Sequence, residues 1–298
     1  LADSGYVTSD TLWERFAALD HIPERLVVLG GGPIGCELAQ AFALLGASVT
    51  QVEVAPRLLL REDDDVSAAA LASQQAVGVD VRLNSRAVRC EGGQGDRRLV
   101  IAAADGSETA LPYDALLVAV GRQARLTGYG LEALGIDTDR TVATDDYLAT
   151  LYPNIYAAGD VAGPYQLTHV ASHQAWFATV NALFGQFKRF KADYRVIPAV
   201  TFLDPEIARV GLNEREAAAQ GIAVDVTTYG LDDLDRAIAD GTAHGFVKLL
   251  TAAGKDRIVG ATIVGAQAGE MLSEFVMAMK FGLGANKVLA TIHSYPTM

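Results

Sequence analysis

Two features of this chain have the residue types and spacing to hold a phosphorylated ligand. The first is a glycine-rich turn, GGGPIG at residues 30–35, which follows an apolar run and opens a helical pattern. Glycines permit a tight turn and a close approach of backbone to a pyrophosphate, and the N-terminus of the following helix attracts an anion. The second is Glu53 at the end of the next apolar run, where a carboxylate accepts hydrogen bonds from ribose hydroxyls and repels a 2′-phosphate. The pattern predicts a site that prefers NAD(H) over NADP(H), built from Gly30, Gly31, Gly32, Pro33, Ile34, Gly35 and Glu53.

The elements around this turn alternate between strand and helix. Apolar, β-branched runs flank a segment of helical period, which makes one βαβ unit. The expected elements are strand 25–30, helix 34–46, strand 48–53, helix 64–77 and strand 115–121. We therefore predict an α/β, Rossmann-like domain over residues 22–143. The alternative is an ordinary glycine-rich connection followed by a surface glutamate.

A second turn could also meet a ligand. The run NIYAAGDVAG, residues 154–163, is predicted as a short buried strand that ends at Gly159 and Asp160. A carboxylate in that place suits a ligand hydroxyl, although an aspartate that caps its own loop is the alternative. From about Asp193 the pattern becomes strands and one long helix, which predicts an α+β domain with an antiparallel sheet.

Composition excludes several classes of protein. The chain has 298 residues, half of them apolar, and can bury two or more cores. Its net charge of −12 would repel nucleic acid. No apolar run reaches the ~18 residues of a membrane helix, so we expect no membrane segment and a cytoplasmic location. Cys36 and Cys90 form no pair with metal-ligand or disulfide spacing, and no metal site is predicted.

Five blocks of the chain resemble, in this order, the pyridine nucleotide-disulfide oxidoreductases: GGGPIGCELAQAFALLGASVTQVE, LLVAVGR, NIYAAGDVAG, VTFLDPEIARVGL and IVGATIVGAQAGEMLSEF. These flavoenzymes include dihydrolipoamide dehydrogenase, glutathione reductase and mercuric reductase, and ELAQAF is most similar to the last. The resemblance implies a Rossmann-like NAD-binding domain inserted in a FAD-binding domain, followed by an α+β dimerisation domain. The implied boundaries are 1–21 and 144–192 for the FAD domain, 22–143 for the NAD domain and 193–298 for the dimerisation domain.

The resemblance also implies roles for residues at the cofactors. Gly159 and Asp160 would contact the ribityl or phosphate region of FAD, and the amides at Thr168 and His169 would open a helix aimed at the flavin ring. Glu37 would lie beside the nicotinamide carboxamide, with an exposed helix-start glutamate as the alternative.

Gly121 and Arg122 match the Gly-Arg turn that the family places near its cofactor, although a surface turn arginine is nearly as good an interpretation.

The last residues of the chain, TIHSYPTM, could supply the acid–base group of the reaction. Where thiol-disulfide members of the family have a histidine before Pro-Thr, this chain has Tyr295. A phenol with a pKa of about 10 is a poor base at neutral pH. The resemblance to mercuric reductase implies a tyrosine at this position, facing a metal ion. We expect His293, two residues earlier, to act as the base in place of the missing histidine. The alternative is that both side chains only pack at an interface.

We expect the intact protein to be a homodimeric oxidoreductase that passes a hydride from NAD(P)H to FAD, then to a cysteine pair and to a small-molecule or metal-ion acceptor. The family's FAD fingerprint and Cys-x4-Cys pair are expected in about 150 residues ahead of this chain, so this chain alone should be inactive and colourless. The alternatives are a dihydrolipoamide dehydrogenase-like enzyme and a non-catalytic NAD(H)-binding redox sensor.

Overall fold

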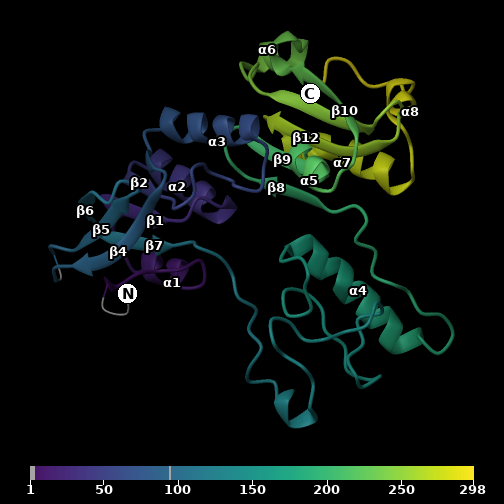
Figure 1. Ribbon diagram of the computed structural model, residues 1–298, viewed down its shortest axis with the longest axis horizontal. Helices are drawn as coiled ribbons and strands as arrows, with labels where there is room; N and C mark the ends of the chain where they lie inside the picture. The colour runs from purple at the N-terminus through teal and green to yellow at the C-terminus, as the bar shows by residue number, and fades with distance from the viewer. Residues whose placement is uncertain (1–3, 94) are drawn as a thin grey trace. The chain divides into compact units, whose positions relative to one another are not determined.

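The computed structural model describes residues 4–93 and 95–298 of the chain. It contains two compact units, which are described separately (Figure 1): residues 1–121 with 200–298, and residues 122–199. Residues 1–3, at the start of the predicted first FAD segment, lie outside the described part. Within the described ranges, no helix has the length and apolar character needed to cross a bilayer.

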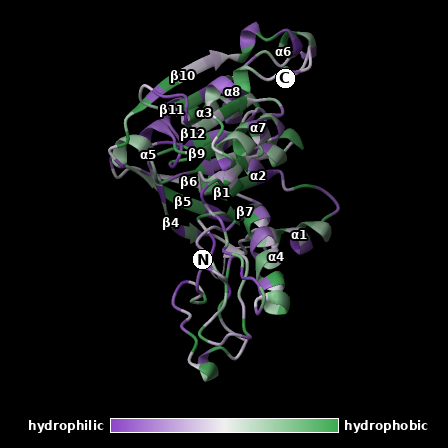
Figure 2. Ribbon diagram, turned by 90° about the vertical axis from the view of Figure 1, so that its right-hand side faces the viewer, coloured by the Kyte–Doolittle hydropathy of each residue, from purple (hydrophilic) through white to green (hydrophobic). Residues whose placement is uncertain are grey.

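A four-stranded parallel sheet forms the base of the larger unit. Its strands are β1 (Arg25–Leu29), β2 (Ser48–Val52), β3 (Asp80–Arg82) and β7 (Ala115–Val118). They lie in the order β3-β2-β1-β7, so the central strand β1 has a neighbour on each side. Leu26 pairs with Val49 on one side and with Ala115 on the other. β1 and β7 are hydrophobic along most of their length (Figure 2), as strands covered on both faces must be.

Alternate residues of β1 supply two cores. Leu26 and Val28 pack in a cluster with Phe42 of α2, while Val27 and Leu29 pack in a cluster with residues of β5 and β6. This is the period of two expected of a strand with both faces buried. The covering elements are α1 (Leu12–Ala17), α2 (Pro33–Leu44), α3 (Asp64–Ala76), and an antiparallel sheet of β4 (Ser85–Glu91), β5 (Arg98–Ala103) and β6 (Glu108–Pro112).

The second part of this unit is an antiparallel sheet in the order β10-β11-β12-β9-β8. Its elements are β8 (Pro198–Thr201), β9 (Glu206–Gly211), α5 (Glu214–Ala219), β10 (Val224–Gly230), α6 (Asp235–Asp240), β11 (Phe246–Ala252), β12 (Ile258–Gly265), α7 (Ala268–Lys280) and α8 (Ala285–Leu289). On the central strand β12, Val264 pairs with both Phe246 and Ile207. The predicted α+β domain with an antiparallel sheet is confirmed, and so are the helix–strand alternation and the parallel sheet of the Rossmann-like part.

The smaller unit carries α4 (Thr168–Phe184) and a short 3-10 helix, Glu132–Leu134. The strand expected from residue 154 to the Gly-Asp turn at Gly159 and Asp160 is wrong: the backbone there makes one isolated bridge, between Ala149 and Tyr156. A strand needs a paired neighbour along its length. The apolar run has such a neighbour at one position, so it is held as a loop.

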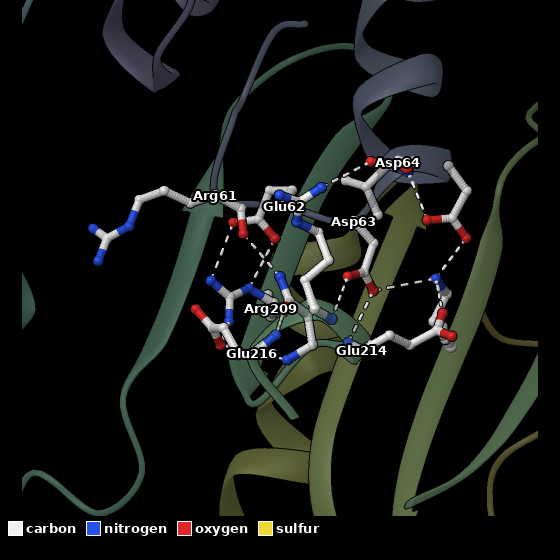
Figure 3. A network of polar contacts seen from close by, with 12 residues as sticks. Arg61, Glu62, Asp63, Asp64, Arg209, Glu214 and Glu216 are labelled. Carbon is white, nitrogen blue, oxygen red and sulfur yellow. Dashed lines mark hydrogen bonds and ion pairs between the residues drawn. The ribbon is translucent and has the colours of Figure 1, made fainter. Parts of the chain in front are cut away.

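The two parts of the larger unit share a core and a polar junction. Leu58, Val66 and Ala70 pack in one buried cluster with Leu203 and Ile207. Beside it, the acidic segment at residues 61–65 meets α5, β9 and β11 in the junction network shown in Figure 3. The network joins Arg61, Glu62, Asp63, Asp64 and Asp65 to Arg209, Asn213, Glu214, Arg215, Glu216 and Lys248.

Lys248 is the most deeply buried charge of this network, with its side chain 3% exposed. Its Nζ lies 2.6 Å from Asp65, 2.7 Å from Glu214 and 3.3 Å from Asp63. Burial lowers the pKa of the ammonium, but the hydrogen bonds to Asp65 and Glu214 and the charges of Asp65 and Asp63 together outweigh burial, and the pKa is raised. Lys248 therefore remains charged and ties α3 to the antiparallel sheet.

We predict that Lys248→Met lowers the free energy of unfolding by about 3 kcal/mol, because it leaves the buried Asp63 carboxylate without its cation. Urea unfolding followed by circular dichroism measures this. Lys255→Met, at an exposed turn, is the matched control and should change the value by less than about 0.5 kcal/mol. A loss for Lys248→Met no larger than for the control would contradict the prediction.

Candidate functional site

Residues 30–35, here called the fingerprint loop, connect β1 to α2. Gly30 has φ +117°, and a Cβ there would lie 2.4 Å from the Ala119 carbonyl oxygen. A Cβ on Gly35 would lie 2.2 Å from the Gly30 carbonyl oxygen. Both distances are far below contact, so only glycine lets α2 begin this close to the end of β1.

The middle of the fingerprint loop faces open space. Gly32 is the N-cap residue of α2 and Pro33 is its first residue, followed by Ile34 in the first turn. A Cβ on Gly32 would have no protein atom within 4 Å, and no side chain caps the helix. A helix N-terminus of this kind, with space beside it, fits the pyrophosphate of a dinucleotide.

Glu53 is tied to the same loop. Its Oε2 accepts a hydrogen bond from Gly31 N–H, and its Oε1 accepts one from Ala55 N–H at 2.7 Å. A cavity of about 400 Å³, lined in part by Val54, Asn84 and Arg86, opens beside the next residue of the chain. The carboxylate thus lies against the fingerprint loop at the end of β2, one residue before a residue that lines this cavity.

Glu37 lies further along α2, on the side that meets the antiparallel part of the unit. Its Oε1 accepts a hydrogen bond of 2.8 Å from Phe202 N–H. Burial raises the pKa of the Glu37 carboxyl, and this hydrogen bond offsets part of the rise. The structure therefore brings Glu37, Glu53 and the fingerprint loop together in one unit.

The residues predicted at the flavin lie in the smaller unit. Arg122, which directly follows Gly121, donates from Nη2 to the Gln166 carbonyl, and its Nη1 lies 3.9 Å from Asp160. Both partners are close to half-exposed. Arg122 of the predicted Gly-Arg turn and Asp160 of the predicted Gly-Asp turn therefore meet within residues 122–199.

Gln174 of α4 holds the Gly-Asp turn and was missed by the sequence analysis. It is fully buried, accepts from Gly159 N–H at 2.6 Å, and donates to the Gly163 carbonyl at 2.7 Å. Gly159 has φ +83°, the left-handed region that favours glycine. A glutamine directly before the apolar run AWFA, residues 175–178, was the signal that could have found it.

The helix α4 begins at Thr168, where it was expected, with Leu167 as N-cap residue and no side chain capping it. His169 Nε2 lies 2.8 Å from the Pro198 carbonyl oxygen. The first turn thus leaves backbone N–H groups for an acceptor.

The two predicted acid–base residues each contact a carboxylate. Tyr295 donates to Asp235 at 2.8 Å, and His293 Nε2 lies 2.6 Å from Glu274 of α7. The hydrogen bond to Asp235 raises the pKa of Tyr295, which makes the phenol a still poorer base. The hydrogen bond to Glu274 raises the pKa of His293 and orients its ring.

Comparisons with known proteins identify relatives of this chain. The curated relatives include a dihydrolipoyl dehydrogenase of Thermus scotoductus, 35% identical over 99% of this chain and 64% of the relative. A mercuric reductase of Streptomyces lividans is 35% identical over 98% of this chain and 60% of the relative. The chain thus spans about three fifths of the length of these relatives.

The fold is also found in solved structures. The HOCl-induced flavoprotein disulfide reductase RclA from Escherichia coli matches 99% of this chain and 66% of its own, with a TM-score of 0.87 and 30% identity. The family model described as pyridine nucleotide-disulphide oxidoreductase matches residues 7–175, and the model of that family's dimerisation domain matches residues 197–298. This chain belongs to the pyridine nucleotide-disulphide oxidoreductase family.

Proposed function

We propose that this chain supplies the NAD(H)-binding and dimerisation parts of a flavin-dependent oxidoreductase. The observation that carries the proposal is the fingerprint loop, open at Gly32 and joined to the Glu53 carboxylate through Gly31 N–H. The loop amides and the start of α2 would hold the pyrophosphate, and Glu53 would accept from the adenosine ribose. The cavity beside Val54 leaves room for the adenine.

When bound, the nicotinamide and the flavin supply hydride transfer, and cysteines outside this chain supply the disulfide. The residues of this chain would bind and orient the two cofactors. Gly159, Asp160, Thr168 and His169 would hold the flavin side, with Arg122 against Asp160. Glu37 would accept from the carboxamide of the nicotinamide. The final electron acceptor in this proposal is a small molecule or a metal ion, as in a mercuric reductase-like enzyme.

One observation favours a second candidate, a dihydrolipoamide dehydrogenase-like enzyme. Exchange between thiols and a disulfide needs a group that gains and loses a proton near neutral pH. The His293–Glu274 pair has the form of such a base, a histidine oriented by a carboxylate. Tyr295, held by Asp235, does not.

We also propose a homodimer formed through residues 193–298. Several large apolar side chains of α7, α8 and the following residues are exposed: Met277, Phe281, Leu283, Leu289 and Ile292. Large apolar side chains exposed along one stretch of chain are typical of an interface. A two-fold contact would place one subunit's tail close to its partner.

Glu53 should make NADH bind at least ~10-fold more tightly than NADPH, because its carboxylate repels the 2′-phosphate. Glu53→Gln should reduce this ratio to about threefold or less, since the negative charge is lost while the size of the side chain is kept. Equilibrium fluorescence titration measures both ligands. Glu24→Gln, next to the opposite end of β1, is the control and should keep the wild-type ratio. Equal binding of the two ligands to the wild type would contradict the role of Glu53.

Phe281→Glu should shift a dimer toward monomer, because it places a charge on a side chain that is 71% exposed at the end of α7. Sedimentation velocity over a concentration series measures the shift. Leu44→Glu, on the exposed side of α2, is the matched control and should leave the dimer intact. A wild type that is monomeric at every concentration would refute the interface.

His293 should titrate above its ordinary value of about 6.5, and Glu274→Gln should return it toward that value. Because the folded-state pKa is raised, the pair stabilises the fold fully below about pH 6.5, and this contribution is lost as the pH rises through the raised pKa. Histidine proton NMR measures both titrations, with Asp235→Asn as the control. The prediction fails if Glu274→Gln leaves the His293 titration unchanged.

A further inference from the structure

Gln40 of α2 is a buried side chain with no role in the proposed function so far. Gln40 is 3% exposed, and its side-chain amide forms hydrogen bonds with both the N–H and the carbonyl group of Asp204. Oε1 accepts from Asp204 N–H at 2.7 Å, and Nε2 donates to the Asp204 carbonyl at 3.1 Å. Nε2 also lies 2.6 Å from Ser73 Oγ, which itself donates to the Asp204 carbonyl at 2.7 Å. The side chain thus pairs with the backbone of Asp204 as a neighbouring strand would.

The bonded segment, residues 202–204, connects β8 to β9 and runs along α2. Glu37 stands three residues before Gln40, on the same face of the helix. Its Oε1 accepts a hydrogen bond from Phe202 N–H. Glu37 and Gln40, one helical turn apart, therefore hold the two ends of the segment. Between them Leu203, 3% exposed, packs in the shared apolar cluster.

Burying an amide is unfavourable unless its polar atoms find partners, and here both find them in one short segment. An apolar side chain could fill the same volume but could not select which backbone groups lie opposite it. The amide therefore sets the register of residues 202–204 along α2. The group whose place depends on that register is Phe202 N–H, the hydrogen-bond donor to Glu37.

The second oxygen of Glu37, Oε2, makes no hydrogen bond among residues 4–93 and 95–298. With Oε1 occupied by a backbone amide, Oε2 is the atom left for a ligand donor. A primary carboxamide is a donor of this type.

We propose that Gln40 is a positioning residue of the dinucleotide site, which holds residues 202–204 on α2 so that Phe202 N–H fixes Glu37 with Oε2 presented to the nicotinamide carboxamide. This inference rests on the proposed NAD(H) function. The proposal means that the part of the site that binds the nicotinamide depends on residues 202–204 of the antiparallel domain. The fingerprint loop does not extend to these residues.

The test compares NADH with ADP-ribose, which has the adenosine and pyrophosphate but no nicotinamide, on the full chain. Gln40→Met should weaken NADH binding by about 3- to 10-fold and change ADP-ribose binding by less than about twofold. Hydrogen exchange at Phe202 N–H and Asp204 N–H should become faster in the same variant. Gln74→Met is the matched control: Gln74 is fully buried and donates to the Cys36 carbonyl at 2.6 Å, without a bond to residues 202–204. It should leave the NADH to ADP-ribose ratio unchanged.

Ser73→Ala is a milder second variant, which removes one hydrogen bond to Asp204 and should shift the ratio in the same direction by a smaller factor. An unchanged ratio in both variants, or equal losses for both ligands, would overturn the role of Gln40 and leave the proposed site standing. Failure of ADP-ribose to bind the wild type would overturn the dinucleotide site itself, and the role of Gln40 with it.

Discussion

The contact between the start of α2 and the end of β1 is the constraint on which the larger unit depends. At Gly35 the helix comes so close to Gly30 that a single Cβ would lie 2.2 Å from a carbonyl oxygen. This approach sets the height of α2 over the parallel sheet, and with it the position of every residue on the helix. The positions of the open N-terminus of α2, of Glu37 and of Gln40 all depend on this close approach. A side chain on Gly35 would therefore move the candidate site as a whole, not one ligand contact.

Buried polar groups then join the Rossmann-like part to the antiparallel sheet. Lys248 and Arg209 each bind more than one carboxylate, and Asp63 accepts backbone N–H groups at the start of α5 although it stands at the N-terminus of α3. Buried ion pairs are poor sources of stability compared with apolar packing, but they tolerate few alternative arrangements. We infer that the junction network sets the register of the two parts, while the apolar cluster around Leu203 supplies most of the free energy.

Two buried glutamines serve the same purpose in the two units. Gln40 bonds the N–H and carbonyl groups of Asp204, and Gln174 bonds Gly159 N–H and the Gly163 carbonyl. An amide has a donor and an acceptor, so it can hold both kinds of backbone group in a turn that has no strand partner. In each case the turn carries or contacts a predicted ligand residue, Glu37 in one unit and Asp160 in the other.

The sequence by itself determined the fold class, the fingerprint loop and the family, because glycine spacing and the periods of two and 3.6 are local properties. It also indicated Tyr295 as a poor base. Tertiary structure decided the contacts whose two partners are distant in the chain. The run at residues 154–163 is a loop, since its backbone makes a single isolated bridge, at Tyr156. Glu53 accepts a hydrogen bond from Gly31 N–H. Gln40 lies 164 residues from Asp204, and His293 lies 19 from Glu274. No pattern along the chain encodes such pairs, because they form only when separate elements pack together.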